Sequence, residues 1–289
     1  MRRACIDIGS NTTRLLVADC AGEGLAEVHQ ERAFTRIGRD VVIEGEISAA
    51  KISEVVTVVC DQLERARGLG AGQVHAVATA AIRHAPNGRA LVEAVEDACG
   101  LEINVLSGEQ EARLAFLGAA RTLGHVPGGS LAVVDVGGGS SELVVGTAPD
   151  TIAWSTSFAV GSGELSDRCL HSDPPSEQEL ADARASLVEA LEGVEPPPAA
   201  EAVAVGGSAT SLRAVAGSRL DGEAFRRALA LLGSDRAAEL ARQFGLDAER
   251  VRLLPAGLLI LQAASELLRA PLQIGRGGVR EGVLLEAGS

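Results

Sequence analysis

Aromatic residues are scarce in this sequence of 289 residues, which has five Phe, one Trp and no Tyr. Few rings are therefore available for the base stacking by which single-stranded nucleic acids are bound. Basic residues are outnumbered, 26 Lys and Arg against 39 Asp and Glu, so the net charge is −13. Nucleic-acid binding needs a basic face that neutralises phosphates, so we expect no nucleic-acid partner. An acidic protein still binds a polyanion where a metal and a few arginines are concentrated at one site.

Cysteines are also few, five in all, and they are odd in number and never spaced as C-x-x-C. Neither a disulfide framework nor a zinc cluster is predicted, which favours a reducing compartment. No run of 18 apolar residues occurs, and the residues before Asp7 leave no room for the apolar core of a signal peptide. We therefore expect a cytoplasmic protein without a membrane partner. The longest apolar stretch, around 258–261, predicts a core helix.

One strand-turn-strand motif occurs twice, as DIGSNTTRLLV at 7–17 and as DVGGGSSELVV at 135–145, which is 128 positions later without a gap. Each copy lies between two apolar runs, a pattern typical of a β-hairpin. Glycines at the tip let backbone N–H groups approach a ligand, and short polar side chains add donors that suit phosphate oxygens. These polar residues are Ser10, Asn11, Thr12, Ser140 and Ser141.

An ordinary tight hairpin would explain one such loop. Two loops in register, opened by Asp7 and Asp135, instead predict duplicated half-domains that face each other across a cleft. Such a cleft would hold a phosphate chain and its metal.

The remaining pattern predicts an α/β layer fold, because strands alternate with helices. In the first half we expect strands at 3–9, 12–20, 24–35, 73–79 and 101–106, with helices from Ser48 to about Arg67 and from Asn87 to about Cys99. A linker is predicted at 124–130. In the second half we expect strands at 131–136, 141–147, 151–158 and 201–205, a helix that starts after 173–176, and a largely helical remainder.

Three further places are candidates for chemistry. Glu111 lies one turn into a helix that opens with a capping box at Ser107, where it could deprotonate a water or simply stabilise the helix dipole. Arg83 follows a strand, in a predicted loop where a lone Arg usually faces solvent. The segment 205–210 (VGGSAT) joins a strand to a helix, which suits either an anion or tight packing.

Together these segments resemble the exopolyphosphatase and guanosine pentaphosphate phosphohydrolase (Ppx/GppA) family, within the superfamily of sugar kinases, Hsp70 and actin. The resemblance covers nearly the whole chain. Superfamily kinases and chaperones share the two Asp-Gly loops but not the S-G-x-x-E-A-R-L segment. The motifs that carry it are DIGSNT at 7–12, ATAAIR at 78–83, SGEQEARL at 107–114, DVGGGSSE at 135–142, HSDPPS at 171–176 and REGVL at 280–284.

The resemblance implies two ribonuclease H-like domains with a cleft between them. We expect one at 1–124, completed by a C-terminal helix at 279–289, and the other at 125–278. It also implies that Glu111 is the general base and that Mg²⁺ is the cofactor, held by Asp135 and Glu142. Asp7 is predicted as a further metal ligand, and Asp135 as a catalytic residue. The predicted phosphate-binding residues are Gly9, Ser10, Asn11, Thr12, Arg83, Gly137, Gly138, Gly139 and Ser140.

Two departures from the family pattern affect the expected function. Glu164 stands where relatives often have an Arg that faces phosphate, and the chain ends without the C-terminal region, similar to HD-type phosphohydrolases, of longer relatives. We therefore expect a homodimeric exopolyphosphatase that prefers short polyphosphate chains. The alternatives are hydrolysis of guanosine pentaphosphate (pppGpp) to the tetraphosphate, another nucleotide hydrolase, and a sensor that binds polyphosphate or a nucleotide without turnover.

Overall fold

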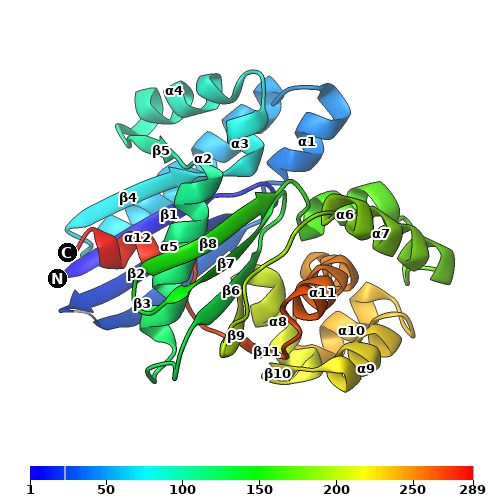
Figure 1. The fold of residues 1–289 in the computed structure, drawn as a ribbon. Helices are drawn as coiled ribbons and strands as arrows, with labels where there is room; N and C mark the ends of the chain where they lie inside the picture. The colour runs from blue at the N-terminus through cyan, green and yellow to red at the C-terminus, as the bar shows by residue number, and fades with distance from the viewer. Residues whose placement is uncertain (23, 289) are drawn as a thin grey trace. The chain divides into compact units, whose positions relative to one another are not determined.

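The computed structural model describes residues 1–22 and 24–288, which form two compact units. Unit 1 comprises Met1–Thr122 and Gly277–Ser289, and unit 2 comprises Leu123–Arg276. The predicted boundaries, after 124 and after 278, lie within two residues of these divisions. The C-terminal segment thus belongs to the same unit as the N-terminus (Figure 1).

Unit 1 is built on a five-stranded sheet in the order β3-β2-β1-β4-β5. The first three strands form an antiparallel meander, and β4 and β5 continue the sheet in parallel to β1. The strands are β1 (Arg2–Ile8), β2 (Thr13–Ala21), β3 (Gly24–Ala33), β4 (Gln73–Ala78) and β5 (Ile103–Val105). The helices are α1 (Ile37–Glu44), α2 (Ala49–Gly68), α3 (Ala80–His84), α4 (Gly88–Cys99), α5 (Gly108–Thr122) and α12 (Val279–Glu286).

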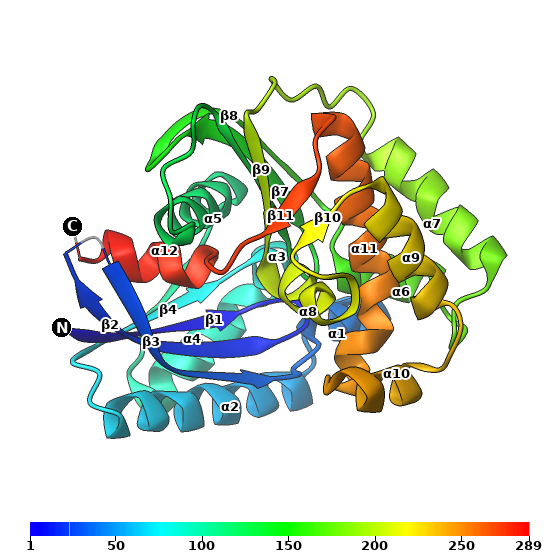
Figure 2. The same cartoon turned by 90° about the horizontal axis from the view of Figure 1, so that it is seen from below.

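Helices cover both faces of this sheet. Alternate residues of β1 point to opposite faces, so each face presents apolar side chains that pack against helices. Ile6 and Ile8 pack on the side that holds α2 and α4, whereas Cys5 packs on the side that holds α5 and α12. Figure 2 shows α2 on one side of the sheet and α12 on the other. The predicted site residues of the first half lie just after β1 and on α3 and α5. These elements all belong to this three-layer unit.

The two helices on the second face, α5 and α12, touch backbone to backbone through glycines. A Cβ atom at Gly118 of α5 would overlap the carbonyl oxygen of Gly278, and one at Gly282 of α12 would overlap that of Leu114. Only glycine allows so close an approach. The C-terminal helix therefore packs directly on the helix that carries Glu111.

Unit 2 repeats this topology on a six-stranded sheet in the order β10-β11-β9-β6-β7-β8. Its first three strands are again an antiparallel meander, and β9 and β11 continue in parallel to β6. Each unit is therefore a ribonuclease H-like α/β domain, as predicted. The strands are β6 (Leu131–Val136), β7 (Ser141–Thr147), β8 (Thr151–Phe158), β9 (Glu201–Val205), β10 (Arg219–Leu220) and β11 (Leu272–Ile274).

The helices of unit 2 are α6 (Ser162–Cys169), α7 (Glu177–Ala190), α8 (Gly206–Ala216), α9 (Gly222–Leu232), α10 (Ala237–Phe244) and α11 (Ala248–Leu268). By length and composition α11 could span a membrane, but 67% of its most apolar window is buried inside the protein. Its leucines, such as Leu258 and Leu261, belong to the unit 2 core. This burial agrees with the predicted core helix around 258–261.

Several short elements differ from the sequence prediction. The predicted loop after β4 is wrong, because Arg83 lies in the short helix α3. Helices α1 and α6 were not predicted, and the remainder after 205 contains β10 and β11 as well as helices. Elements of two to eight residues carry too little periodicity to be recognised, and contacts made by the surrounding fold stabilise them.

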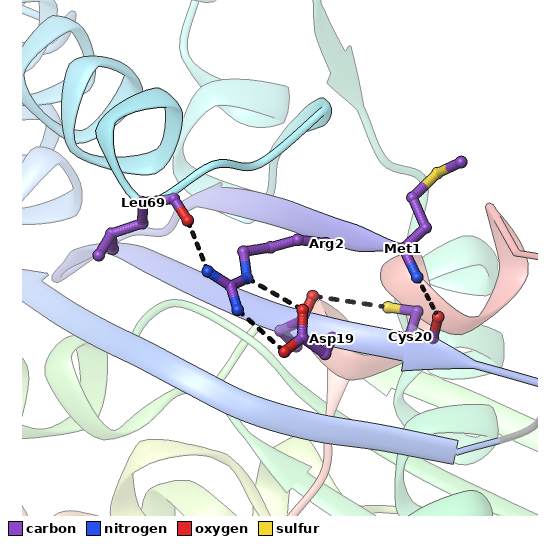
Figure 3. A network of polar contacts seen from close by, with 6 residues as sticks. Met1, Arg2, Asp19, Cys20 and Leu69 are labelled. Atoms are coloured by element: carbon purple, nitrogen blue, oxygen red, sulfur yellow. Dashed lines mark hydrogen bonds and ion pairs between the residues drawn. The ribbon is translucent and has the colours of Figure 1, made fainter.

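Polar contacts attach the N-terminus at the start of β1, the central strand of the unit 1 sheet (Figure 3). Arg2 and Asp19 are cross-strand partners on β1 and β2 and form a bidentate pair, with N–O distances of 2.9 and 3.0 Å. Arg2 also donates to the carbonyl of Leu69, and the Met1 amino group donates to that of Cys20. Hydrogen bonding from Arg2 lowers the pKa of the exposed Asp19 carboxyl.

Helix α7 begins with a capping box that predicts a pH-dependent stability. Glu179 accepts hydrogen bonds from the N–H groups of Ser176, Ser172 and His171, which hold its pKa at about 2. Because this folded-state value lies below the unfolded value, the stabilisation is complete above about pH 4.3 and is lost as the pH falls toward 2. We expect Glu179→Gln to lower the melting temperature at pH 7 by about 2–4 °C, and less at pH 3.

Thermal unfolding monitored by circular dichroism at both pH values measures this difference. Glu177→Gln, on the same turn of α7 but outside the capping box, is the matched control. An equal loss at pH 7 and pH 3 would contradict the electrostatic origin of the effect.

Candidate functional site

The two glycine loops predicted to bind phosphate close with the same hydrogen bond. In unit 1 the N–H of Gly9 donates to the carbonyl of Thr12, and in unit 2 that of Gly137 donates to the carbonyl of Ser140, both at 3.0 Å. The paired positions are 128 residues apart, as in the sequence repeat. The predicted duplication is therefore present in the loop geometry as well as in the sheets.

In each loop, carbonyl groups accept hydrogen bonds from the start of a following helix. In unit 1 the carbonyl of Ser10 accepts from Gly38 of α1 at 2.8 Å, and that of Asn11 accepts from Arg36 at 3.0 Å. Helix α1, which the sequence analysis missed, thus holds the first loop in place. Gly38 is the sequence feature that reflects this contact, because a Cβ atom at position 38 would lie 3.2 Å from the Cβ atom of Ser10.

The second loop is held by α6 in the same way, with more contacts. The carbonyl of Gly137 accepts from Ser162, and that of Gly138 accepts from both Gly163 and Glu164, at 2.9–3.0 Å. A side chain at Gly161 would overlap the backbone of Gly138, so the helix and the loop touch directly. The N-terminal N–H groups of α6 are therefore used by the loop and not by a ligand.

This arrangement leaves amide groups at the loop tips available. Among the described residues, the N–H groups of Ser10, Asn11, Gly138 and Gly139 donate no hydrogen bond. The side-chain nitrogen of Asn11 is buried, also without a partner. Buried donors without partners are costly unless a ligand satisfies them, and oxyanions match several convergent amides. Ser141, by contrast, donates to the carbonyl of Val160 at 2.7 Å and so serves the fold.

The two predicted metal-binding carboxylates of unit 2 lie side by side. Asp135 and Glu142 are direct cross-strand partners on β6 and β7, so both side chains lie on one face of the sheet. Ser157 of β8 donates to Glu142 at 2.9 Å. Gly206 has φ 86°, and a Cβ there would overlap the Asp135 carboxylate, so a glycine at this position leaves room for the carboxylate.

This pair suits Mg²⁺, which binds through one or two carboxylates and takes its other ligands from water and phosphate. Within the described residues no group of three or more His, Cys, Asp or Glu side chains is placed to hold a metal. The donor set thus fits a hard cation that arrives with a phosphate ligand, and not a fully protein-coordinated ion such as structural zinc.

Asp7, predicted as a third metal ligand, has different surroundings from Asp135. Its cross-strand partner is Arg14, which occupies the position that Glu142 has in unit 2. Burial raises the pKa of Asp7, whereas the nearby Arg280 and Arg14 act in the opposite direction. One carboxylate oxygen of Asp7 is buried without a hydrogen-bond partner. The structure therefore surrounds Asp7 with two cations, Arg280 and Arg14, and with the carboxylate of Glu281.

Glu111 and Arg83 are brought together, although they lie 28 residues apart. The Nη1 atom of Arg83 is 2.5 Å from the carboxylate of Glu111 and 2.5 Å from the carbonyl oxygen of Leu106. The Glu111 side chain is 6% exposed and that of Arg83 is 20% exposed. The predicted capping box of α5 is confirmed by reciprocal bonds between Ser107 and Gln110. Arg83 is thus not the solvent-facing residue that its sequence context predicted.

The segment 205–210 joins β9 to α8, as predicted. Arg250 of α11 lies against it, because a Cβ atom at Gly207 would be only 2.8 Å from the guanidinium. The Arg250 side chain is buried, and sequence analysis gave no signal for it. Ser208 is also buried, with a hydroxyl that lacks a partner among the described residues. This loop therefore has a cation on one side, in addition to its tight packing.

Glu164, the departure from the family pattern, is the third residue of α6. Its carboxylate is half-buried, with one oxygen 3.3 Å from Arg168 and the other buried without a partner among the described residues. Burial raises the pKa of Glu164, Arg168 lowers it and Asp167 raises it. The residue itself is next to the second loop, because its backbone N–H donates to the carbonyl of Gly138.

Comparisons with known proteins agree with the earlier resemblance. Exopolyphosphatase 2 of Mycobacterium tuberculosis is 38% identical over 201 residues, which are 66% of this chain and 62% of that protein. Exopolyphosphatase 1 of Mycobacterium bovis is 28% identical over 99% of this chain and 88% of its own. A crystal structure of the Aquifex aeolicus member of the Ppx/GppA family is 29% identical and matches 100% of this chain and 97% of that one, with a TM-score of 0.82.

The alignment with the first of these relatives spans less than two thirds of its length, so the relative's activity is not transferred by the match alone. The family model itself, described as the Ppx/GppA phosphatase family, matches residues 16–288 and thus covers both units. The matched range includes the loop at 137–140, the carboxylate pair and the buried Arg-Glu pair. The chain belongs to the Ppx/GppA phosphatase family.

Proposed function

We propose that this protein is an exopolyphosphatase, which hydrolyses the terminal phosphoanhydride bond of inorganic polyphosphate and releases orthophosphate. The observation that carries the proposal is the buried Glu111 carboxylate held by Arg83. An arginine has five N–H donors, and only Nη1 of Arg83 is engaged among the described residues. The same guanidinium is thus able to hold a base and to contact a phosphate oxygen.

In this proposal Glu111 accepts the proton of the water that attacks the terminal phosphorus, and the bond between that phosphorus and the bridging oxygen breaks. The available N–H groups of Ser10, Asn11, Gly138 and Gly139 at the loop tips bind phosphate oxygens. Asp135 and Glu142 would hold Mg²⁺, which supplies neutralisation of phosphate charge when bound. The assay is phosphate release from polyphosphate and from pppGpp at equal concentration, in which the proposal expects the higher kcat/KM for polyphosphate.

Hydrolysis of pppGpp is the second candidate, and the loop at 205–210 favours it. Arg250 behind Gly207 and the partnerless hydroxyl of Ser208 are features that an inorganic chain does not require. Preferential release of phosphate from pppGpp in the same assay would establish this alternative. Binding of either compound without phosphate release would instead favour the sensor.

We further propose a preference for short chains, because a long polyphosphate is repelled by a protein of net charge −13. Gel analysis of partial digests would then show intermediate chains that shorten gradually. Full-length chains that persist beside free phosphate would contradict it. A homodimer would lengthen the binding surface, so the molar mass in solution has to be measured with the same samples.

If Asp135 and Glu142 hold the metal, substitutions at these residues should reduce metal affinity more than a substitution at Asp7. We expect Asp135→Asn and Glu142→Gln each to weaken Mn²⁺ binding by about tenfold or more, because each variant removes an anionic oxygen ligand. Asp7→Asn should change the affinity by no more than about twofold, because Arg14 and Arg280 already surround this group. Electron paramagnetic resonance of Mn²⁺ titrated without substrate measures all three affinities. An equal loss of Mn²⁺ affinity in the three variants would show that Asp7 is also a metal ligand.

A further inference from the structure

The helices that hold the two loops carry opposite charges at equivalent positions. Gly38 of α1 donates to the carbonyl of Ser10, and Gly163 of α6 donates to that of Gly138, which is the equivalent loop residue 128 positions later. The next residue is Arg39 in unit 1 and Glu164 in unit 2. The duplicated framework therefore has a cationic residue beside one loop and an anionic residue beside the other.

The cross-strand positions show the same asymmetry. Arg14 is paired with Asp7 in unit 1, and Glu142 is paired with Asp135 in unit 2. Two equivalent positions thus differ in charge in the same direction. Arg14 and Arg39 thus add positive charge on the unit 1 side, whereas Glu142 and Glu164 add negative charge at the equivalent positions of unit 2, which favours a phosphate that carries a cation there.

Glu164 is not fully neutralised by its own ion pair. Arg168 lies 3.3 Å from one of its carboxylate oxygens and also donates to Ser186, while the other oxygen is buried without a partner among the described residues. The backbone N–H of Glu164 is bonded to Gly138, so the residue cannot move away from the loop without breaking that contact. Its backbone is therefore fixed to the loop, and its carboxylate stays within one side-chain length of that attachment.

We propose that Glu164 makes the loop at 137–140 selective for phosphate that carries a divalent cation over free phosphate. The inference rests on the proposed function, in which this loop binds the phosphate chain. A cation that accompanies the phosphate adds an attraction to Glu164 that offsets the repulsion between the two anions, whereas free phosphate is only repelled. Glu164 thus acts as a specificity residue for the charge state of the substrate.

The test is calorimetric titration with imidodiphosphate, whose P–N–P bond resists hydrolysis, in EDTA and in excess Mg²⁺. We expect Glu164→Gln to tighten metal-free binding by about 3–10-fold and Glu164→Arg, which copies Arg39, by about tenfold or more. The Kd in Mg²⁺ should tighten far less or weaken in both variants. Glu189→Gln, an equal charge change on the exposed face of α7, should leave both constants within about twofold.

The ratio of the metal-free Kd to the Kd in Mg²⁺ is the deciding quantity. A ratio that stays within twofold of the wild-type value in Glu164→Gln would overturn the proposal, as would equal tightening under both conditions. If Glu164→Arg fails to fold, as shown by circular dichroism, the near-isosteric Gln variant still decides. Phosphate release by the wild-type protein is measured separately: no release from polyphosphate refutes the proposed function, whereas an unchanged ratio in an active protein refutes only the selectivity.

Discussion

Glu111→Gln is expected to reduce kcat by about 10²–10⁴, the contribution of a positioned general base. The amide is nearly isosteric with the carboxylate and can still accept a hydrogen bond from Arg83, but it cannot take a proton from water at neutral pH. Substrate affinity should change little. Steady-state phosphate release and equilibrium binding of imidodiphosphate, measured on the same preparation, separate these two effects.

The control for this variant is Glu109→Gln, on the same first turn of α5 but exposed to solvent. Both variants remove one negative charge near the helix N-terminus, so any contribution of the helix dipole is similar in the two. A Glu111→Gln variant that keeps more than about a tenth of wild-type activity would show that Glu111 is not the base. Its role would then be limited to the ion pair and the helix dipole.

Arg83→Met is expected to destabilise unit 1 by about 3–5 kcal/mol, because it removes one side of a buried ion pair and keeps the Glu111 charge in place. Activity should fall as well, since the base loses the group that positions it. Chemical denaturation measures the free energy of unfolding. The exposed pair Arg89–Glu93 is a matched control, and Arg89→Met should cost no more than about 1 kcal/mol.

The double variant Arg83→Met/Glu111→Gln isolates the interaction between the two side chains. Once Glu111 is neutral, loss of Arg83 no longer leaves a buried charge, so the second substitution should cost about 1–3 kcal/mol less than it does in the wild-type background. Additive losses would mean that Arg83 stabilises the unit through its bond to the Leu106 carbonyl instead.

Local signals in the sequence were sufficient for the elements that are long or chemically distinctive. The helix predicted from Ser48 is α2, and the Ser48 side chain caps it by accepting from the N–H of Lys51. Its predicted apolar face is present, with Val55, Val59 and Leu63 buried. Capping and helical periodicity act over a few residues, so they are readable without knowledge of the rest of the fold.

The repeat at 7–17 and 135–145 extended this prediction to the whole molecule, because the same motif at a constant offset implies the same hairpin twice. The matching bonds from Gly9 to Thr12 and from Gly137 to Ser140 confirm that inference. What the repeat could not predict is how the copies differ. Arg14 and Glu142 occupy equivalent positions, and the consequence of that difference depends on which side chains surround Asp7 and Asp135.

The sequence by itself determined the two ribonuclease H-like halves, the pair of glycine loops and the candidate residues within them, because these depend on spacing along the chain. Only the tertiary structure decided that Arg83 binds Glu111, that Arg14 and Arg280 surround Asp7, and that α1 and α6 hold the loop carbonyls. Apart from Arg14 and Asp7, which are 7 positions apart, these contacts join residues that are 25 to 273 positions apart. Charge interactions act through space and vary with burial, so chain spacing carries no record of them.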